Sequence, residues 1–183
     1  SFKTNGIIPC QNILRVAGSL LPADIAVLSA IEMPERFHAR FSAKSKEYIY
    51  KISILPGPNP FLYDRCWMLG KKLNLAKMNE AAKLLIGEKD FAAFCSTGSD
   101  SISTIRRVDR AEFSQDGDMV IFDILANGFL YHMVRNLVWS LVQVGLGKRT
   151  VTDFQKELNS PRNAFLSSPA PAGGLYLKRV NYE

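Results

Sequence analysis

The chain has 183 residues, of which 47% are hydrophobic, enough for one substantial core or for two small cores that share an interface. Lysine and arginine (23) exceed aspartate and glutamate (17) by six, a balance that suggests a polyanionic partner without identifying one. The three cysteines are odd in number and widely spaced, which argues against a disulfide framework and is typical of a reducing cytoplasm. The two histidines lack the spacing of a metal motif, so we expect no metal site.

Hydrophobic periodicity and turn residues predict helices and strands along the whole chain. In chain order the pattern predicts a helix at 11–20, strands at 24–33, 46–55 and 66–69, a helix at 75–86, a loop at 88–101 with a turn of helix at 90–94, strands at 104–114 and 119–126 joined by a hairpin, a helix through Arg135 closed by Gly145 and Gly147, a helix at 152–158, a loop at 167–174 and a final strand at 175–180. This order predicts an α+β fold, an antiparallel-rich mixed sheet with helices packed on one face.

The strongest strand signal is the aromatic and β-branched stretch 46–55, in which alternation places Tyr48 and Tyr50 on the same face. The clearest break in the chain follows at once, at Pro56-Gly-Pro-Asn-Pro60. We expect this break to divide the chain into a first region, residues 1–55, and an α+β domain, residues 56–183, that carries the helix through Arg135.

Arg135 is the only formally charged residue between Asp123 and Lys148, and it lies in an apolar run with the spacing of a helix that is buried on one face. Its guanidinium cannot lose its proton, so out of water it requires a carboxylate or a phosphate as partner. No acidic residue lies within two helical turns, and we infer that Arg135 marks a site. The alternative is an arginine that reaches the surface or pairs with a distant structural carboxylate. A membrane span is excluded, because a central arginine costs about 2.5–3.5 kcal/mol there.

Residues 37–50 interleave basic and aromatic side chains. Basic side chains can follow phosphates while aromatic rings stack on bases, so this block predicts contact with single-stranded or looped RNA. Its candidate RNA-binding residues are His38, Arg40, Lys44 and Lys46. The alternative is a solvated basic loop whose aromatic residues pack in the core, which we prefer for Phe37 and Phe41 but not for Arg40 and Tyr48.

Three further residues have two possible roles each. Arg106 and Arg107 open a predicted strand and can hold an RNA backbone, or they are solvated charges at a strand edge. His132 precedes Arg135 by three positions and either orients RNA or fills space; we prefer the structural role.

Four blocks along the chain resemble, in order and spacing, the TruA-type tRNA pseudouridine synthases. The blocks are Phe37-His-Ala-Arg-Phe-Ser-Ala43 leading into Tyr48-Ile-Tyr50, Gly87-Glu-Lys-Asp-Phe91, Asn127-Gly-Phe-Leu-Tyr-His-Met-Val-Arg-Asn136, and Ala170-Pro-Ala-Gly-Gly-Leu-Tyr-Leu177. The family isomerises uridine to pseudouridine in the anticodon stem–loop of tRNA, without metal or organic cofactor, and an aspartate attacks the nucleoside. The resemblance implies a partial pseudouridine synthase fold, a cytoplasmic location and a homodimer with tRNA lying across both subunits.

The resemblance also implies roles for individual residues. Tyr48 matches the family tyrosine that stacks on the target uracil, and Arg135 matches the basic residue that pairs with the catalytic aspartate. Leu175 matches the apolar residue that lines the base pocket. Residues 1–55 then correspond to the remainder of an N-terminal catalytic subdomain.

The sequence departs from the family at the nucleophile. The Gly-Arg-Thr-Asp motif that carries it is absent, and Phe2-Lys-Thr4 resembles the strand that follows that motif. We therefore expect the nucleophile to precede Ser1, the chain alone to be inactive, and Arg135 to lie at a solvent-open cleft or a bound anion, because an uncompensated buried charge can cost about 3–5 kcal/mol. A non-catalytic RNA-binding module and a plain structural or oligomerisation domain are the alternative functions.

Overall fold

A computed structural model describes residues 1–98, 102–161 and 168–183. The helices are α1 (Cys10–Leu20), α2 (Leu75–Lys83), α3 (Met133–Gly145) and α4 (Val151–Leu158), and the strands are β1 (Ser45–Ser53), β2 (Trp67–Met68), β3 (Gly87–Asp90), β4 (Ile105–Asp116), β5 (Met119–Ala126) and β6 (Leu175–Asn181). Short 3-10 turns are η1 (Pro60–Leu62), η2 (Ala92–Phe94) and η3 (Ala172–Gly174). None of the described helices is long and apolar enough to span a membrane.

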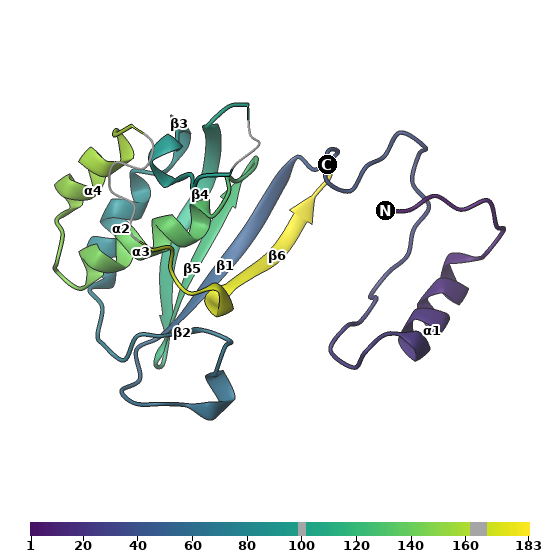
Figure 1. Ribbon diagram of the computed structural model, residues 1–183, viewed down its shortest axis with the longest axis horizontal. Coiled ribbons are helices and arrows are strands. Elements are labelled where there is room, and N and C mark those ends of the chain that lie inside the picture. The colour runs from purple at the N-terminus through teal and green to yellow at the C-terminus, as the bar shows by residue number, and fades with distance from the viewer. Residues whose placement is uncertain (99–101, 162–167) are drawn as a thin grey trace. The chain divides into compact units, whose positions relative to one another are not determined.

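The chain divides into two compact units, Ser1–Ala43 and Lys44–Glu183. The second unit contains all six described strands in one sheet of order β2-β1-β5-β4-β3, with β6 also paired to β1. Every pairing is antiparallel except that of β1 with β2. Helices α2, α3 and α4 cover one face of this sheet (Figure 1). The predicted α+β fold, with an antiparallel-rich mixed sheet and helices on one face, is therefore confirmed. The functional boundary predicted at 55–56 stays a prediction.

Alternation along the central strands builds the core. Tyr50 and Ile52 on β1, and Phe122 and Ile124 on β5, are fully buried and point to the helix-covered face. Successive side chains of a strand point to opposite faces, so the residues between them point to the other face of the sheet. Because Tyr48 precedes Tyr50 by two positions, it also faces the helices, as the sequence predicts.

Two predicted elements are wrong. Residues 24–33 form no strand: Leu28 and Ile31 are largely exposed, and the unit Ser1–Ala43 has no described strand to pair with this segment. Residues 87–90, which overlap the start of the loop predicted at 88–101, form β3 and pair with β4. The charged sequence Gly-Glu-Lys-Asp gives no local strand signal, so only pairing with a distant strand makes this segment extended. The predicted turn of helix after it is confirmed as η2, whereas residues 99–101 of that loop lie outside the described residues.

A buried ion pair joins α4 to the end of α3. Glu157 is 1% exposed, and its Oε2 accepts a hydrogen bond from Arg149 Nη1 at 2.8 Å. Ser140 on α3 donates a second, short hydrogen bond to the same oxygen. Burial raises the pKa of the Glu157 carboxyl, although both hydrogen-bonding partners and the charge of Arg149 oppose that shift. The pair thus fixes the helix that carries Arg135 against the helix that follows it.

Replacing Glu157 tests this arrangement. We expect Glu157→Ala to lower the free energy of unfolding by about 3 kcal/mol, because it leaves Arg149 and Ser140 without their acceptor. Because the folded-state pKa of Glu157 is raised, the folded chain binds an extra proton between pH 4.5, its ordinary pKa, and that raised value. Stability should therefore fall as pH rises through this window, and Glu157→Gln should abolish that fall. Urea unfolding as a function of pH measures both effects, and equal pH profiles for the two proteins would contradict the account.

Candidate active site

The structure brings Tyr48, Arg135 and Leu175 to the same face of the sheet. On the paired strands β1 and β6, Tyr50 lies opposite Leu175 and Tyr48 lies opposite Leu177. Tyr48 and Leu175 are therefore diagonal neighbours that point toward the helix layer, where α3 carries Arg135. All three side chains are only partly buried. This combination of an aromatic, an apolar and a cationic group at a partly open position is typical of a binding site.

Arg135 is fixed by the segment that leads into β6. Its Nε donates a hydrogen bond to Ala170 O at 2.6 Å, and its own carbonyl accepts one from Ala170 N at 3.2 Å. The phenol of Tyr50 donates to the next carbonyl, Pro171 O, at 2.6 Å. Two successive residues are thus tied to α3 and to β1, and they determine where Leu175 enters the sheet. Among the described residues, no ion pair includes Arg135. The sequence predicts that its charge requires an anionic partner, and this part of the chain supplies no carboxylate for it.

Both tyrosines remain protonated at neutral pH. Burial raises the pKa of Tyr48, and it raises that of Tyr50 strongly, although the nearby positive charge of Arg135 opposes the second shift. The ring of Phe129, in the turn before α3, meets the ring of Tyr48 edge-on with centroids 5.0 Å apart. The site therefore offers a neutral phenol, apolar walls and one guanidinium, a set suited to a planar base next to an anion.

Glycine at position 174 is required by this packing. A Cβ there would lie 2.6 Å from Tyr50 Cζ and 2.9 Å from Lys51 O, well inside van der Waals contact. We expect Gly174→Ala to displace the start of β6, and with it Leu175, and to cost about 1–3 kcal/mol of unfolding free energy. Gly18→Ala is the control, because a Cβ at position 18 meets nothing within 4 Å. Chemical denaturation followed by the fluorescence of the tryptophans measures the effect; a Gly174→Ala protein as stable as the parent would contradict the packing described.

The predicted RNA-binding residues separate into groups. Lys46 lies on β1 two positions before Tyr48, so it points to the same face. Arg106 approaches the turn before α3: a Cβ on Gly128 would lie 3.5 Å from its Nε. Lys46 on β1 and Val108 on β4 both pair with Ala126 on β5, from opposite sides of that strand. Because Arg106 lies two positions before Val108, Lys46 and Arg106 lie at the same end of the sheet as the site.

The other predicted basic residues are placed differently. Arg107 points away from the helix layer, and its Nε forms a 3.0 Å ion pair with Asp109. Lys44 is exposed, and its backbone N–H donates to Asn181 O at 2.8 Å. His38 and Arg40 belong to the unit Ser1–Ala43, so they are not placed relative to Tyr48.

The local structure around His38 corrects one prediction. Its Nδ1 accepts hydrogen bonds from the backbone N–H groups of Arg40 and Phe41, and its ring lies 4.4 Å from the ring of Phe41. Phe41 is 74% exposed, so the prediction that it packs in the core is wrong. It lies instead at the surface under the guanidinium of Arg40, 5.5 Å away. A short loop without a packed layer beneath it cannot bury this ring.

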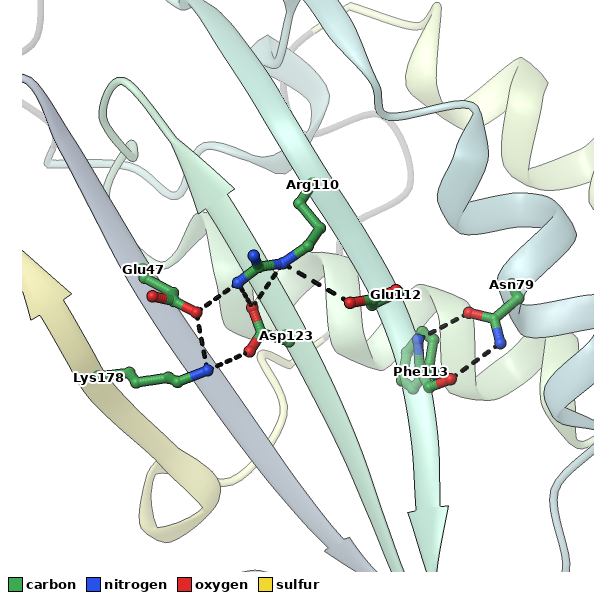
Figure 2. A network of polar contacts seen from close by, with 7 residues as sticks. All are labelled: Glu47, Asn79, Arg110, Glu112, Phe113, Asp123 and Lys178. Carbon is green, nitrogen blue, oxygen red and sulfur yellow. Dashed lines mark hydrogen bonds and ion pairs between the residues drawn. The ribbon is translucent and has the colours of Figure 1, made fainter.

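Asp123 is excluded from the site by its own partners on the opposite face of the sheet. Figure 2 shows it between Arg110 and Lys178, whose nitrogens lie 2.6 and 2.7 Å from its two carboxylate oxygens. Glu47 contacts the same two cations, so four strands are joined by one network. Partial burial alone would raise the pKa of Asp123. The hydrogen bonds from Lys178 and Arg110 outweigh burial, so the pKa of this carboxyl lies below its usual value. This carboxylate is ionised and fully engaged in holding the sheet together.

Sequence reasoning misses the residues that orient the site. Tyr50 and Phe129 lie in the blocks on which the family resemblance rests, but their contacts with Pro171 and Tyr48 are not visible in any spacing. Alternation along β1 places Tyr50 on the same face as Tyr48, and this alternation is the signal that could indicate Tyr50. The carbonyl of Ala170 gives no signal at all, because every residue has one.

Comparison with known proteins identifies the class. Residues 81–183 match a family model described as tRNA pseudouridine synthase. The tRNA pseudouridine synthase A of Thermoanaerobacter sp. (strain X514) is 40% identical over 182 residues, which cover 100% of this chain and 75% of the relative. The namesake protein of Moorella thermoacetica is 41% identical over 183 residues, covering 100% of this chain and 74% of the relative. The chain therefore belongs to the tRNA pseudouridine synthase family, as its four sequence blocks predicted.

Proposed function

We propose that this chain carries the uridine-binding half of an active site that isomerises uridine to pseudouridine in the anticodon stem–loop of tRNA. The observation that carries the proposal is the convergence of Tyr48, Arg135 and Leu175 from three separate elements on one partly open face. Family membership supports tRNA as the substrate. A cytoplasmic homodimer, which the resemblance implies, completes the proposal.

Each side chain has a distinct role in the proposed reaction. The ring of Tyr48 stacks on the target uracil, and its neutral phenol is available for proton transfer. Leu175 and Phe129 line the base pocket and exclude water. Arg135 holds the attacking aspartate through its guanidinium fork. The aspartate bonds to the nucleoside as the C–N glycosidic bond breaks, and the base keeps the electron pair of that bond. The base then rotates, and a C–C bond to its C5 forms as the aspartate is released. The C5 proton leaves, and N1 of the base gains a proton.

The attacking aspartate, in this proposal, comes from residues that precede Ser1 in the parent protein. The aspartates within the described residues that could replace it have other partners: Asp123 is held by two cations, Asp109 pairs with Arg107, and Asp90 Oδ1 accepts a hydrogen bond from Ala92 N. Asp64 is exposed, and no hydrogen bond or ion pair of the described residues joins it to Arg135. A supplied carboxylate would complete the set of charges at the site.

The proposed path of the RNA follows the basic residues. Lys46 and Arg106 lie at the end of the sheet that carries Tyr48. In this proposal they contact phosphates that flank the target. His38, Arg40, Lys44 and Arg107 are proposed as outer contacts, which position the RNA without reading its sequence. Binding should therefore weaken steeply as salt rises.

Tritium release from uracil C5 of a labelled tRNA transcript tests the function. We expect no release by this chain and release by a protein that is extended upstream to the start of its gene. In the extended protein, Arg135→Ala should reduce kcat by about 10²-fold or more and Arg135→Lys by less, because lysine keeps the charge but loses the fork. Tyr48→Phe should reduce kcat without weakening binding, because the ring remains. Lys83→Ala, at the exposed end of α2, is the matched control for a lost positive charge.

The outcomes separate the alternatives. Release by the short chain would mean that one of its own carboxylates is the nucleophile, against the proposal. Silence of both proteins, together with tighter binding of the stem–loop than of an unrelated hairpin at the same salt, would favour a non-catalytic RNA-binding module.

A further inference from the structure

Two neighbouring aromatic side chains, Tyr131 and His132, lie flat against each other at the start of α3. Their ring centroids are 3.9 Å apart and the ring planes are inclined by only 24°. The backbone of His132 is left-handed, with φ 59° and ψ 7°, a conformation that costs free energy for a residue with a Cβ. The carbonyl of Tyr131 accepts a hydrogen bond from Ser96 N at 3.1 Å, which holds the turn in place. The stacked pair is therefore a defined feature of the fold.

The outer ring of the pair is open to solvent. Tyr131 is 50% exposed although His132 stacks on one face of its ring. His132 behind it is only partly buried. A buried aromatic pair would be explained by core packing, but an aromatic ring that is supported on one side and open on the other has the form of a stacking surface.

The pair lies close in the chain to two residues of the proposed site, Phe129 and Arg135. Tyr131 follows Phe129, whose ring contacts Tyr48, by two positions. His132 precedes Arg135 by one turn of the chain, and the positive charge of Arg135 acts on it: burial first, and then that charge, lower the pKa of the imidazole. At neutral pH the imidazole of His132 is therefore uncharged, whereas the guanidinium of Arg135 is not.

We propose that Tyr131, backed by His132, is a stacking platform for an unpaired nucleobase of the RNA substrate, the base next to the uridine that Tyr48 receives. This inference rests on the function proposed above, because it places the neighbouring base relative to that uridine. An unpaired base offers a flat π face at any sequence, and Arg106, near Gly128 in the turn before α3, carries a positive charge that can meet the RNA backbone. Family membership supports tRNA as the substrate, so RNA is the molecule that would supply such a base.

A fluorescent base reports on the platform directly. The full chain is titrated, at one fixed salt concentration, with an anticodon stem–loop that carries 2-aminopurine next to the target uridine. We expect binding to quench the fluorescence, because a stacked 2-aminopurine is quenched. Tyr131→Ala should remove the quenching and weaken binding about 5- to 150-fold, the range measured for one base–aromatic stack. Tyr131→Trp should retain both the quenching and the affinity.

Two further variants exclude indirect effects. Tyr63 is 80% exposed and lies after η1, away from α3 in the chain, so Tyr63→Ala is the matched control and should leave binding and quenching unchanged. His132→Gly keeps the left-handed backbone without strain but removes the supporting ring, and should give an intermediate loss. Urea unfolding of each variant confirms that it is folded.

Each outcome decides between the proposals. If the Tyr131→Ala protein quenches the fluorescence as much as the parent does, the stacking platform is overturned. The proposed function then still holds, provided that the parent prefers the stem–loop to an unrelated hairpin. A change in oligomeric state with unchanged RNA affinity would also overturn it, because Tyr131 would then be a subunit contact. A parent chain without preference for the stem–loop would overturn both proposals together.

Discussion

The two hydrogen bonds that hold residues 170 and 171 determine the geometry of the candidate site. Arg135 donates to the first carbonyl and Tyr50 to the second, so a helix and a central strand are both tied to the segment that enters β6. Leu175 can therefore lie beside Tyr48 only while both donors are in place. The guanidinium has a double function in this arrangement: one N–H fixes the backbone, and the remaining donors are available for an anion.

The two faces of the sheet have different functions. The face under α2, α3 and α4 (Figure 1) carries the core and the candidate site. The other face carries the network of Glu47, Arg110, Asp123 and Lys178, which joins β1, β4, β5 and β6 through alternating charges (Figure 2). Because these acidic groups are neutralised within the sheet, they do not balance the positive charge of Arg135 from a distance.

The parts of the fold that follow from local pattern were predictable. Alternation in β1 places Tyr48 and Tyr50 on one face, and the i, i+3, i+4 spacing of α3 shows that Arg135 interrupts a buried helix. Non-local effects were not predictable. The segment 87–90 is a strand only because β4 pairs with it. The segment 24–33 is not a strand, because its unit has no described strand that pairs with it. The acceptor of Arg135 is a backbone carbonyl from a distant segment, and no side-chain pattern encodes that contact.

The central claim is that Arg135 pairs with a carboxylate that the described residues do not supply. A double-mutant cycle in the upstream-extended protein tests it most directly, combining Arg135→Ala with replacement of the proposed aspartate by alanine. If the two groups pair, their effects on the free energy of unfolding should deviate from additivity by about 1–3 kcal/mol. Effects that add within about 0.5 kcal/mol would show that the two groups are independent and would contradict the claim.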